Sequence, residues 1–146
     1  MIGDGSLRGW LRSRLPDAVF NGDLHTGHLA VALASLDLLV HPGAEEGCCH
    51  AVREAAASGV PVVAGRPDGG LSVVRHLETG LLHDPEDPRA LARAVAAIAA
   101  DPHRSLLGQR ARELLTARTW RVAVDELVER HYRPLACREP RMALPA

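Results

Sequence analysis

The chain has 146 residues, of which 47% are hydrophobic and 24% are charged, and its formal net charge is −1. This length is enough for one domain that buries about two-thirds of its unfolded surface, but not for two full domains. The near-neutral charge gives no electrostatic reason to expect nucleic-acid binding. No apolar run approaches the roughly 18 residues that a membrane-spanning helix needs.

The three cysteines indicate neither a disulfide framework nor a metal site. Cys48 and Cys49 are adjacent, a spacing that does not readily form a disulfide, and Cys137 lies far along the chain. Residues 1–5 lack the charged and then apolar pattern of a secretion signal. We therefore expect a protein of the reducing cytoplasm, without a bound metal.

The first part of the chain alternates short helical and strand patterns. A helix over residues 6–15 is predicted by apolar side chains at helical spacing, namely Leu7, Trp10, Leu11 and Leu15. A brief strand is expected at residues 18–20, then a helix at 28–34 and a second strand at 37–40.

The central stretch predicts a loop, a short helix and a buried strand. The helix is expected over residues 51–57, because Gly59 is a typical stop signal and Pro61 cannot continue a helix. The strand at residues 59–64 opens on a glycine-rich loop, and a short helix then precedes a further strand at 79–83. This alternation implies a parallel sheet with helices on its faces.

From Asp84 onward the pattern is helical. Three amphipathic helices are predicted by three apolar stripes: Leu91, Val95 and Ile98; then Leu107, Ala111, Leu114 and Leu115; then Trp120, Val124, Leu127 and Val128. Periodicity is lost after Tyr132. We expect one domain over residues 1–132 and a tail over 133–146.

The start of the central helix is the best candidate for a binding site. In open parallel sheets, ligands lie outside the carboxyl ends of the strands, and the loop from His41 to Glu46 leads from such an end to a helix N-terminus. The first amides of that helix lack intrahelical partners and suit a phosphate or sugar hydroxyls. Glu54 lies about 12 Å beyond Glu46 if the residues between them are helical, so the two carboxylates address different parts of one ligand.

The same residues also have a purely structural interpretation. Acidic residues at a helix N-terminus commonly just complement the helix dipole, which stabilises by about 0.3–1 kcal/mol. His50 can be a surface histidine, and Cys48 and Cys49 can be small apolar fillers. The glycine-rich loop at residues 65–70 lacks the dinucleotide-binding spacing G-x-G-x-x-G. The residues alone leave both interpretations open.

The run HPGAEEGCCHAVREAAASGVPVVAG, residues 41–65, resembles the donor-site segment of group 1 (family 4-like) retaining glycosyltransferases of the GT-B fold. Their Glu-x7-Glu motif falls on Glu46 and Glu54. Family members commonly have an aromatic residue and a glycine where this chain has Cys48 and Cys49, and a cysteine at the second of these positions resembles a branch that includes GDP-mannose-dependent mannosyltransferases. The match extends in order through Gly3-Asp4-Gly5, Phe20-x-Gly22, Ala34-x-x-Asp37, Gly69-Gly70, Thr79-Gly80-Leu81-Leu82, Trp120 and Tyr132.

The resemblance implies an α/β fold: a Rossmann-like parallel sheet with flanking helices, the C-terminal half of a GT-B fold with its first strand missing, followed by C-terminal helices. It implies the donor-binding half of an enzyme that moves a hexose from a GDP- or UDP-sugar to an acceptor with retention, without a cofactor. The implied roles are sugar alignment at the catalytic Glu46, sugar and phosphate contacts at Gly47, Cys48, Cys49 and His50, ribose binding at Glu54, and base binding at Gly22 and Leu24.

The resemblance also implies that parts of such an enzyme lie outside this sequence. The family's acceptor domain, its catalytic-site histidine, and the Arg and Lys that hold the diphosphate have no counterpart here, and the chain has no lysine. A helix N-terminus contributes at most about 2 kcal/mol, whereas ten-micromolar affinity needs roughly −7 kcal/mol. We therefore expect weak donor binding by the chain alone, and an acceptor domain or partner chain that completes the site. The complete enzyme could associate peripherally with a membrane.

Two alternatives to a transferase half stay open. One is a degenerate, non-catalytic module or gene fragment that keeps the fold, and the other is a small nucleotide-binding domain. In either case the missing first strand would separate the strands around Phe20 and Val40 and leave unpaired edges, which favour aggregation.

Overall fold

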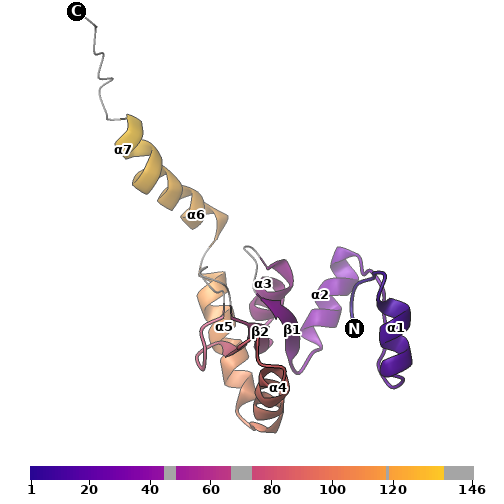
Figure 1. Cartoon of the computed structure of the whole chain (residues 1–146). Coiled ribbons are helices and arrows are strands. Elements are labelled where there is room, and N and C mark those ends of the chain that lie inside the picture. The colour runs from indigo at the N-terminus through magenta and orange to yellow at the C-terminus, as the bar shows by residue number, and fades with distance from the viewer. Residues whose placement is uncertain (45–48, 67–73, 118, 137–146) are drawn as a thin grey trace, which may run out of the picture.

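A computed structural model describes residues 1–44, 49–66, 74–117 and 119–136 of the chain. A small parallel sheet and the helices around it form the body of the molecule (Figure 1). Two helices near the N-terminus lie on one side of this body, and the C-terminal helix projects away from it (Figure 1). Among the described residues, no helix is long and apolar enough to cross a membrane.

The sheet consists of β1 (Leu39–Ala44), β2 (Val62–Gly65) and β3 (Gly80–His83), in the order β1-β2-β3. All neighbouring strands are parallel, as predicted from the alternation of strands and helices. The middle strand β2 is buried along its whole length, which explains its continuous apolar sequence.

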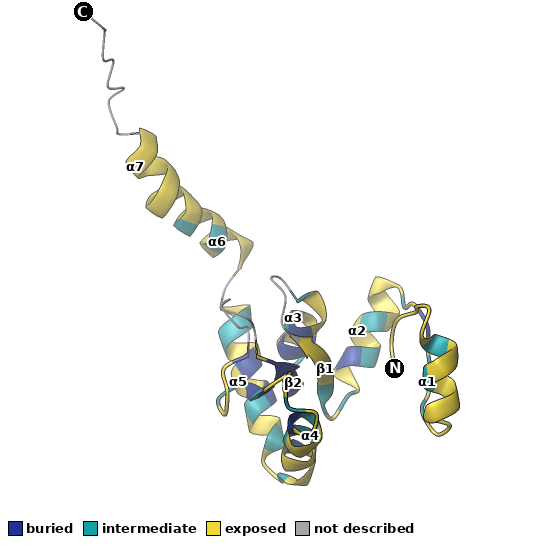
Figure 2. Ribbon diagram, in the orientation of Figure 1, coloured by how far each residue is buried: buried dark blue, intermediate teal, exposed yellow. Residues whose placement is uncertain are grey.

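Helices α2 (Thr26–Ala34) and α3 (His50–Ala57) cover one face of the sheet. On this face a hydrophobic core joins Leu33 of α2 and Val52 of α3 to Val62 and Ala64 of β2. The pleat directs Val63 to the opposite face, where α4 (Ala90–Ala100) packs on β2 and β3. The buried regions in Figure 2 accordingly centre on β2 and the helices next to it.

Helix α5 (Arg104–Thr116) makes a contact near the start of each strand. Arg104 pairs with Asp37 ahead of β1, at 3.3 Å, and Arg110 pairs with Glu78 ahead of β3, at 3.5 Å. Between them, Gly108 lies directly against the backbone of Gly59, ahead of β2. The helix therefore ties together the amino-terminal edge of the sheet, opposite the edge where ligands bind in this class of fold.

The strand predicted at residues 18–20 does not form. These residues join no sheet, and the neighbouring Gly22 makes only an isolated antiparallel bridge to Gly3. A strand needs a hydrogen-bonded neighbour, and among the described residues none lies between this segment and β1. The first helix, α1 (Arg8–Arg14), forms as predicted but buries none of its residues.

Two further boundaries differ from the predictions. The strand expected at residues 37–40 begins at Leu39 and continues to Ala44. The short helix expected ahead of Thr79 is absent from residues 74–79, and the rest of its range lies outside the described residues. The helices predicted at 28–34, at 51–57 and in the first two stripes after Asp84 are confirmed as α2, α3, α4 and α5.

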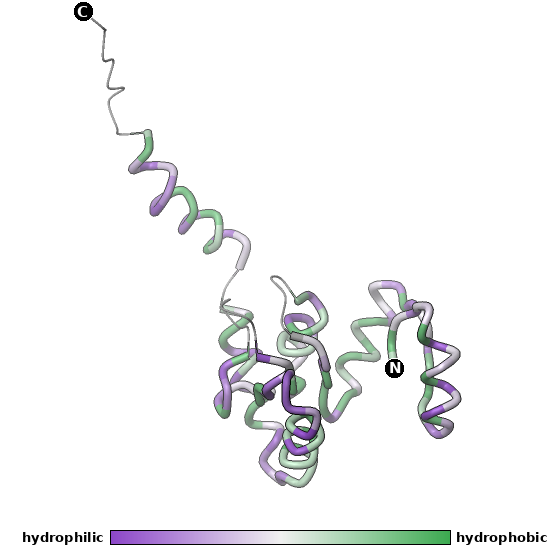
Figure 3. Tube along the Cα trace, in the orientation of Figure 1, coloured by the Kyte–Doolittle hydropathy of each residue, from purple (hydrophilic) through white to green (hydrophobic). Residues whose placement is uncertain are grey.

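The C-terminal helix is longer than predicted. It consists of α6 (Trp120–Leu127), the π-helical turn η1 (Val128–Tyr132) and α7 (Arg133–Ala136), so the predicted tail begins at least four residues too early. None of the three segments buries a residue, and hydrophobic and hydrophilic positions alternate along them in Figure 3. Residues 137–146 lie outside the described part.

Candidate functional site

The carboxyl ends of the three strands lie side by side. Ala44 of β1 pairs with Gly65 of β2, and Gly65 pairs with His83 of β3. The predicted site residues Glu46, Gly47 and Cys48 follow β1 directly but lie outside the described residues. The structure therefore shows the two ends of the predicted loop, and their geometry defines the site.

Strand β1 is irregular just before this loop. His41 pairs with Ala64, but the next pair is Ala44 with Gly65, so Pro42 and Gly43 are extra residues in β1. The ring nitrogen Nδ1 of His41 lies 3.2 Å from the carbonyl oxygen of Gly43 across this bulge. Bulges commonly redirect a chain next to functional sites, and a proline in a strand is tolerated at a sheet edge. This bulge redirects β1 into the predicted donor loop.

Helix α3 begins at the far end of the loop with an open N-terminus. Cys49 is the N-cap residue, and its side chain makes no capping hydrogen bond to the first-turn amides. The first intrahelical bond runs from the Arg53 N–H to the Cys49 carbonyl oxygen at 3.1 Å. The first turn contains no acidic residue. Of the amides predicted to contact phosphate, those of Cys49 and His50 have no hydrogen-bond acceptor within the described part of the chain, and those of Gly47 and Cys48 lie outside it.

The side chains of this turn divide into two groups. Cys49 is half-buried and packs against the hydrophobic core, as expected for a small apolar filler. His50 and Glu54 are exposed, four residues apart on one face of α3. The backbone carbonyl of Glu54 accepts hydrogen bonds from Ser58, but its carboxylate has no partner among the residues that the structure describes and is available to a ligand.

The predicted base-binding residues lie at the start of the neighbouring helix. Gly22 is buried and has a φ of 67°, in the left-handed region that favours glycine. Leu24 is half-buried and precedes His25, the N-cap residue of α2. Helices α2 and α3 contact each other, and Figure 1 shows their first turns at the same end of the molecule. The fold thus brings the segment that precedes α2 and the first turn of α3 to the same end of the molecule.

Asp4 and Arg8 form an ion pair next to Gly22, one of the predicted base-binding residues. The Gly5 N–H and Arg8 Nη1 each donate to the Asp4 carboxylate at 2.8 Å. These contacts lower the pKa of Asp4 below its ordinary value, with the Gly5 bond as the main cause. A Cβ on Gly22 would lie 3.7 Å from Arg8 Nη1. Arg8 is therefore already engaged in an ion pair next to Gly22.

Two cations near this edge were not among the predicted site residues. Arg53, on α3, has a buried Nε atom without a hydrogen-bond partner. Arg66 is exposed and follows β2 directly. The alternation of side chains along β2 is a signal that could have placed Arg66 on the α3 side of the sheet, but the predicted strand ended at residue 64.

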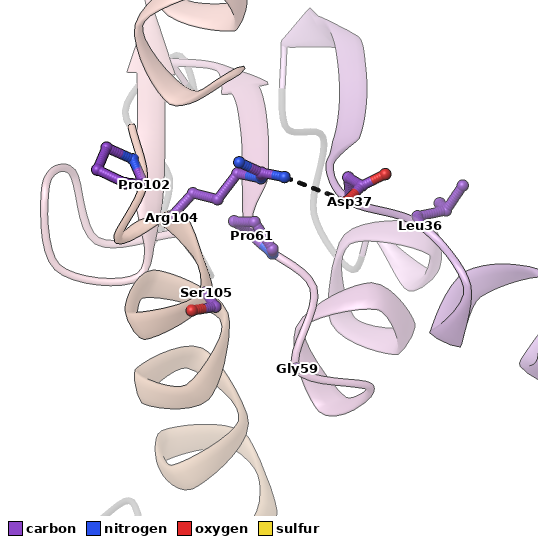
Figure 4. Close-up of a pocket in the computed structure, with 7 residues that line it drawn as sticks. All are labelled: Leu36, Asp37, Gly59, Pro61, Pro102, Arg104 and Ser105. Atoms are coloured by element: carbon purple, nitrogen blue, oxygen red, sulfur yellow. Dashed lines mark hydrogen bonds and ion pairs between the residues drawn. The ribbon is translucent and has the colours of Figure 1, made fainter. Parts of the chain in front are cut away.

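A pocket at the opposite edge of the sheet is a weaker candidate. It is lined by Leu36, Asp37, Gly59, Pro61, Pro102, Arg104 and Ser105, and Figure 4 shows Arg104 and Asp37 pointing toward each other across it. Its volume of about 270 Å³ falls below the roughly 300–1,000 Å³ of small-molecule sites. It also lies at the amino ends of the strands, away from the ligand edge of open parallel sheets.

Comparison with known proteins supports this fold. The family model described as "Glycosyl transferases group 1" matches residues 1–101. A GDP-mannose-dependent alpha-mannosyltransferase of Mycolicibacterium smegmatis is 43% identical over 98% of this chain and 38% of its own length. A protein of the same name from Corynebacterium glutamicum is 36% identical over 99% of this chain and 35% of its own length.

A solved structure supports the same fold. A sucrose-phosphate synthase from Thermosynechococcus elongatus superimposes with a TM-score of 0.76 and 28% identity, over 94% of this chain and 38% of that one. The sheet and its helices match the C-terminal, Rossmann-like half of GT-B glycosyltransferases, as the resemblance implied. The chain spans less than two-fifths of the length of these relatives.

Proposed function

Because the chain belongs to the group 1 glycosyl transferases, we propose that it is the donor-binding half of an enzyme that transfers a hexose from a nucleoside diphosphate sugar with retention. The observation that carries this proposal is the carboxyl edge of the sheet. There a bulged β1 leads to an uncapped α3 whose Glu54 is exposed and unpaired within the described ranges. Such an edge suits a ligand with both phosphate and hydroxyl groups.

We further propose GDP-mannose as the donor. Two relatives that are 43% and 36% identical over nearly the whole chain are both named as GDP-mannose-dependent mannosyltransferases. The half-buried Cys49 at the start of α3 agrees with the branch suggested by the sequence. A UDP-hexose is the alternative donor, and it carries uracil where GDP-mannose carries guanine.

Each predicted residue has a chemical task in this proposal. The exposed Glu54 accepts hydrogen bonds from the ribose hydroxyls, and the amides of Gly47, Cys48, Cys49 and His50 bind the donor sugar and phosphates. The loop of Gly22 and Leu24 packs against the base, largely through its backbone. Glu46 aligns the sugar and stabilises positive charge at the anomeric carbon. The transfer then proceeds by front-face attack or by double displacement, without a metal or a cofactor.

The proposed enzyme also needs an acceptor domain, which binds the second substrate, the acceptor of the hexose. Since the chain corresponds to less than two-fifths of its relatives, we assign the acceptor domain to a further part of the polypeptide or to a partner chain. We place the complete enzyme in the cytoplasm, where nucleotide sugars are made available, with any membrane contact peripheral and made by the complete enzyme.

Calorimetric titration of the chain with GDP-mannose and UDP-glucose tests this function. We expect weak binding, near 1 mM or about −4 kcal/mol, with preference for GDP-mannose. Glu54→Ala removes hydrogen bonds to a charged group and is expected to weaken binding by roughly tenfold or more. Glu86→Ala, at an exposed position between β3 and α4, is the matched control. Binding that is unchanged by Glu54→Ala would remove the ribose assignment, and no binding of either donor would favour a non-catalytic module.

A further inference from the structure

Arg66 is held at the point where β1 leaves the sheet for the donor loop. Its backbone N–H donates to the His83 carbonyl oxygen at 2.8 Å, which extends the pairing of β2 and β3 by one residue. The preceding residue, Gly65, pairs with Ala44, the last residue of β1. Neighbouring strands lie about 4.8 Å apart, so an arginine side chain at the end of β2 is long enough to reach past Ala44, the last residue of β1.

The side chain of Arg66 belongs to the face of the sheet that carries α3. Val62 and Ala64 both pack into the core beneath α2 and α3. Side chains alternate along a strand, so Arg66, two residues after Ala64, lies on the same face. It is exposed at the carboxyl end of β2, on the face that α3 covers.

Arg66 has no ion-pair partner in the described parts of the chain, unlike several other arginines of the molecule. Acidic partners hold these other arginines in place, in the pairs Arg8–Asp4, Arg75–Glu78, Arg93–Asp87 and Arg104–Asp37. An exposed arginine that the fold positions but leaves unpaired is suited to an anionic ligand, because its planar guanidinium binds a phosphate through two parallel hydrogen bonds.

We propose that the Arg66 guanidinium binds the diphosphate of the nucleotide held at the start of α3. This inference rests on the proposed function, because it takes the ligand at this edge to be a nucleoside diphosphate sugar. Arg66 supplies a cation from within the chain, so the diphosphate does not depend on the dipole of α3 alone. It is a binding residue: it contacts the phosphates and takes no part in proton transfer.

Titration calorimetry with GDP and with guanosine separates this role from a structural one. Arg66→Gln is expected to weaken GDP binding by roughly tenfold and to leave guanosine binding unchanged, because guanosine has no phosphate. Arg66→Lys keeps the charge but loses the pair of parallel hydrogen bonds. Its affinity for GDP is therefore expected to lie between that of the unaltered chain and that of Arg66→Gln. Arg121→Gln, which removes the same charge from the projecting helix, is the control.

The dependence on salt gives a second measurement on the same proteins. Arg66→Gln is expected to reduce the slope of log affinity for GDP against log salt concentration, and Arg121→Gln is not. GDP affinity within twofold of the unaltered chain for both Arg66 variants would overturn the inference, while a persisting effect of Glu54→Ala would leave the proposed function intact. No GDP binding by the unaltered chain at millimolar concentration would overturn both.

Discussion

At the scale of single residues, Gly108 is the position with the least room for change. A Cβ at this position would lie 2.0 Å from the carbonyl oxygen of Gly59 and 3.0 Å from the backbone nitrogen of Pro61. Neither atom belongs to a flexible side chain, so an added methyl group would push α5 away from the turn between α3 and β2. This contact fixes how closely α5 approaches the sheet.

We predict that Gly108→Ala lowers the free energy of unfolding by about 1–3 kcal/mol or more, the usual cost of overpacking. Urea denaturation followed by circular dichroism measures the change. Gly27→Ala, in α2, is the control, because a Cβ there meets nothing within 4 Å and alanine is the better helix former by up to about 1 kcal/mol. Equal stabilities for the two variants would show that α5 does not approach the turn so closely.

The candidate site shows which residues local sequence could predict. The end of α3 follows from Gly59 and Pro61, and its length follows from the helix-forming run just before them, all within a few residues of one another. Arg66 was missed because its position depends on where β2 ends and which face of the sheet its side chain occupies. Those properties come from pairing with β1 and β3, which the local pattern does not contain.

At the scale of elements, Asp87 lies just ahead of α4 and holds the start of this helix through two hydrogen bonds. Its Oδ1 atom accepts from the Arg89 N–H at 2.8 Å, and its Oδ2 atom accepts from Arg93 Nη2 at 2.6 Å. Both bonds, chiefly the one from Arg93, lower the pKa of Asp87 below its ordinary value. They stabilise the ionised carboxylate in the folded state, so this contribution is present above the unfolded pKa and is lost as the pH falls through the lowered one.

Asp87→Asn is therefore expected to lower the melting temperature at pH 7. The difference from the unaltered chain should shrink as the pH is lowered from about 4 toward 2, where the carboxylate of the unaltered chain is protonated as well. Thermal melts across this range test the prediction, with Asp125→Asn on α6 as the control for a lost surface charge. A difference that stays constant from pH 7 to pH 2 would contradict it.

The elements that the sequence pattern misjudged are those that depend on a distant partner. Residues 18–20 have strand-forming side chains, but a strand forms only where another strand lies beside it. Strand β1 runs four residues further than predicted because pairing with β2 continues past the Pro42 and Gly43 bulge, which locally resembles a loop. The amphipathic helices, whose signal lies within one stretch of chain, were predicted with small boundary errors.

At the scale of the whole molecule, two regions expose apolar surface. One surrounds the outer edge of β1, where no described strand pairs and where Val40 and Val31 are 40% and 70% exposed. The other is the projecting helix, on which Trp120, Leu127 and Leu135 are 87%, 45% and 61% exposed (Figure 2). Contiguous apolar surface and an open strand edge both favour association with another chain.

We predict that the isolated chain expresses poorly or self-associates unless a partner covers these regions. Sedimentation velocity over a range of concentrations should show species larger than a monomer. Val40→Lys places a charge on the open edge and is expected to reduce association, whereas Val19→Lys, at an exposed position outside the sheet, is expected to have less effect. A soluble monomer that melts in one cooperative transition would refute this prediction.

The central claim is that a nucleoside diphosphate sugar binds at the carboxyl edge of the sheet. Mapping amide chemical shifts of ¹⁵N-labelled chain during titration with GDP-mannose tests it most directly. The account predicts concentration-dependent shifts at His50, Glu54 and Arg66 and none around the pocket of Asp37 and Arg104. Shifts confined to that pocket at the amino ends of the strands, or no shifts at millimolar GDP-mannose, would contradict it.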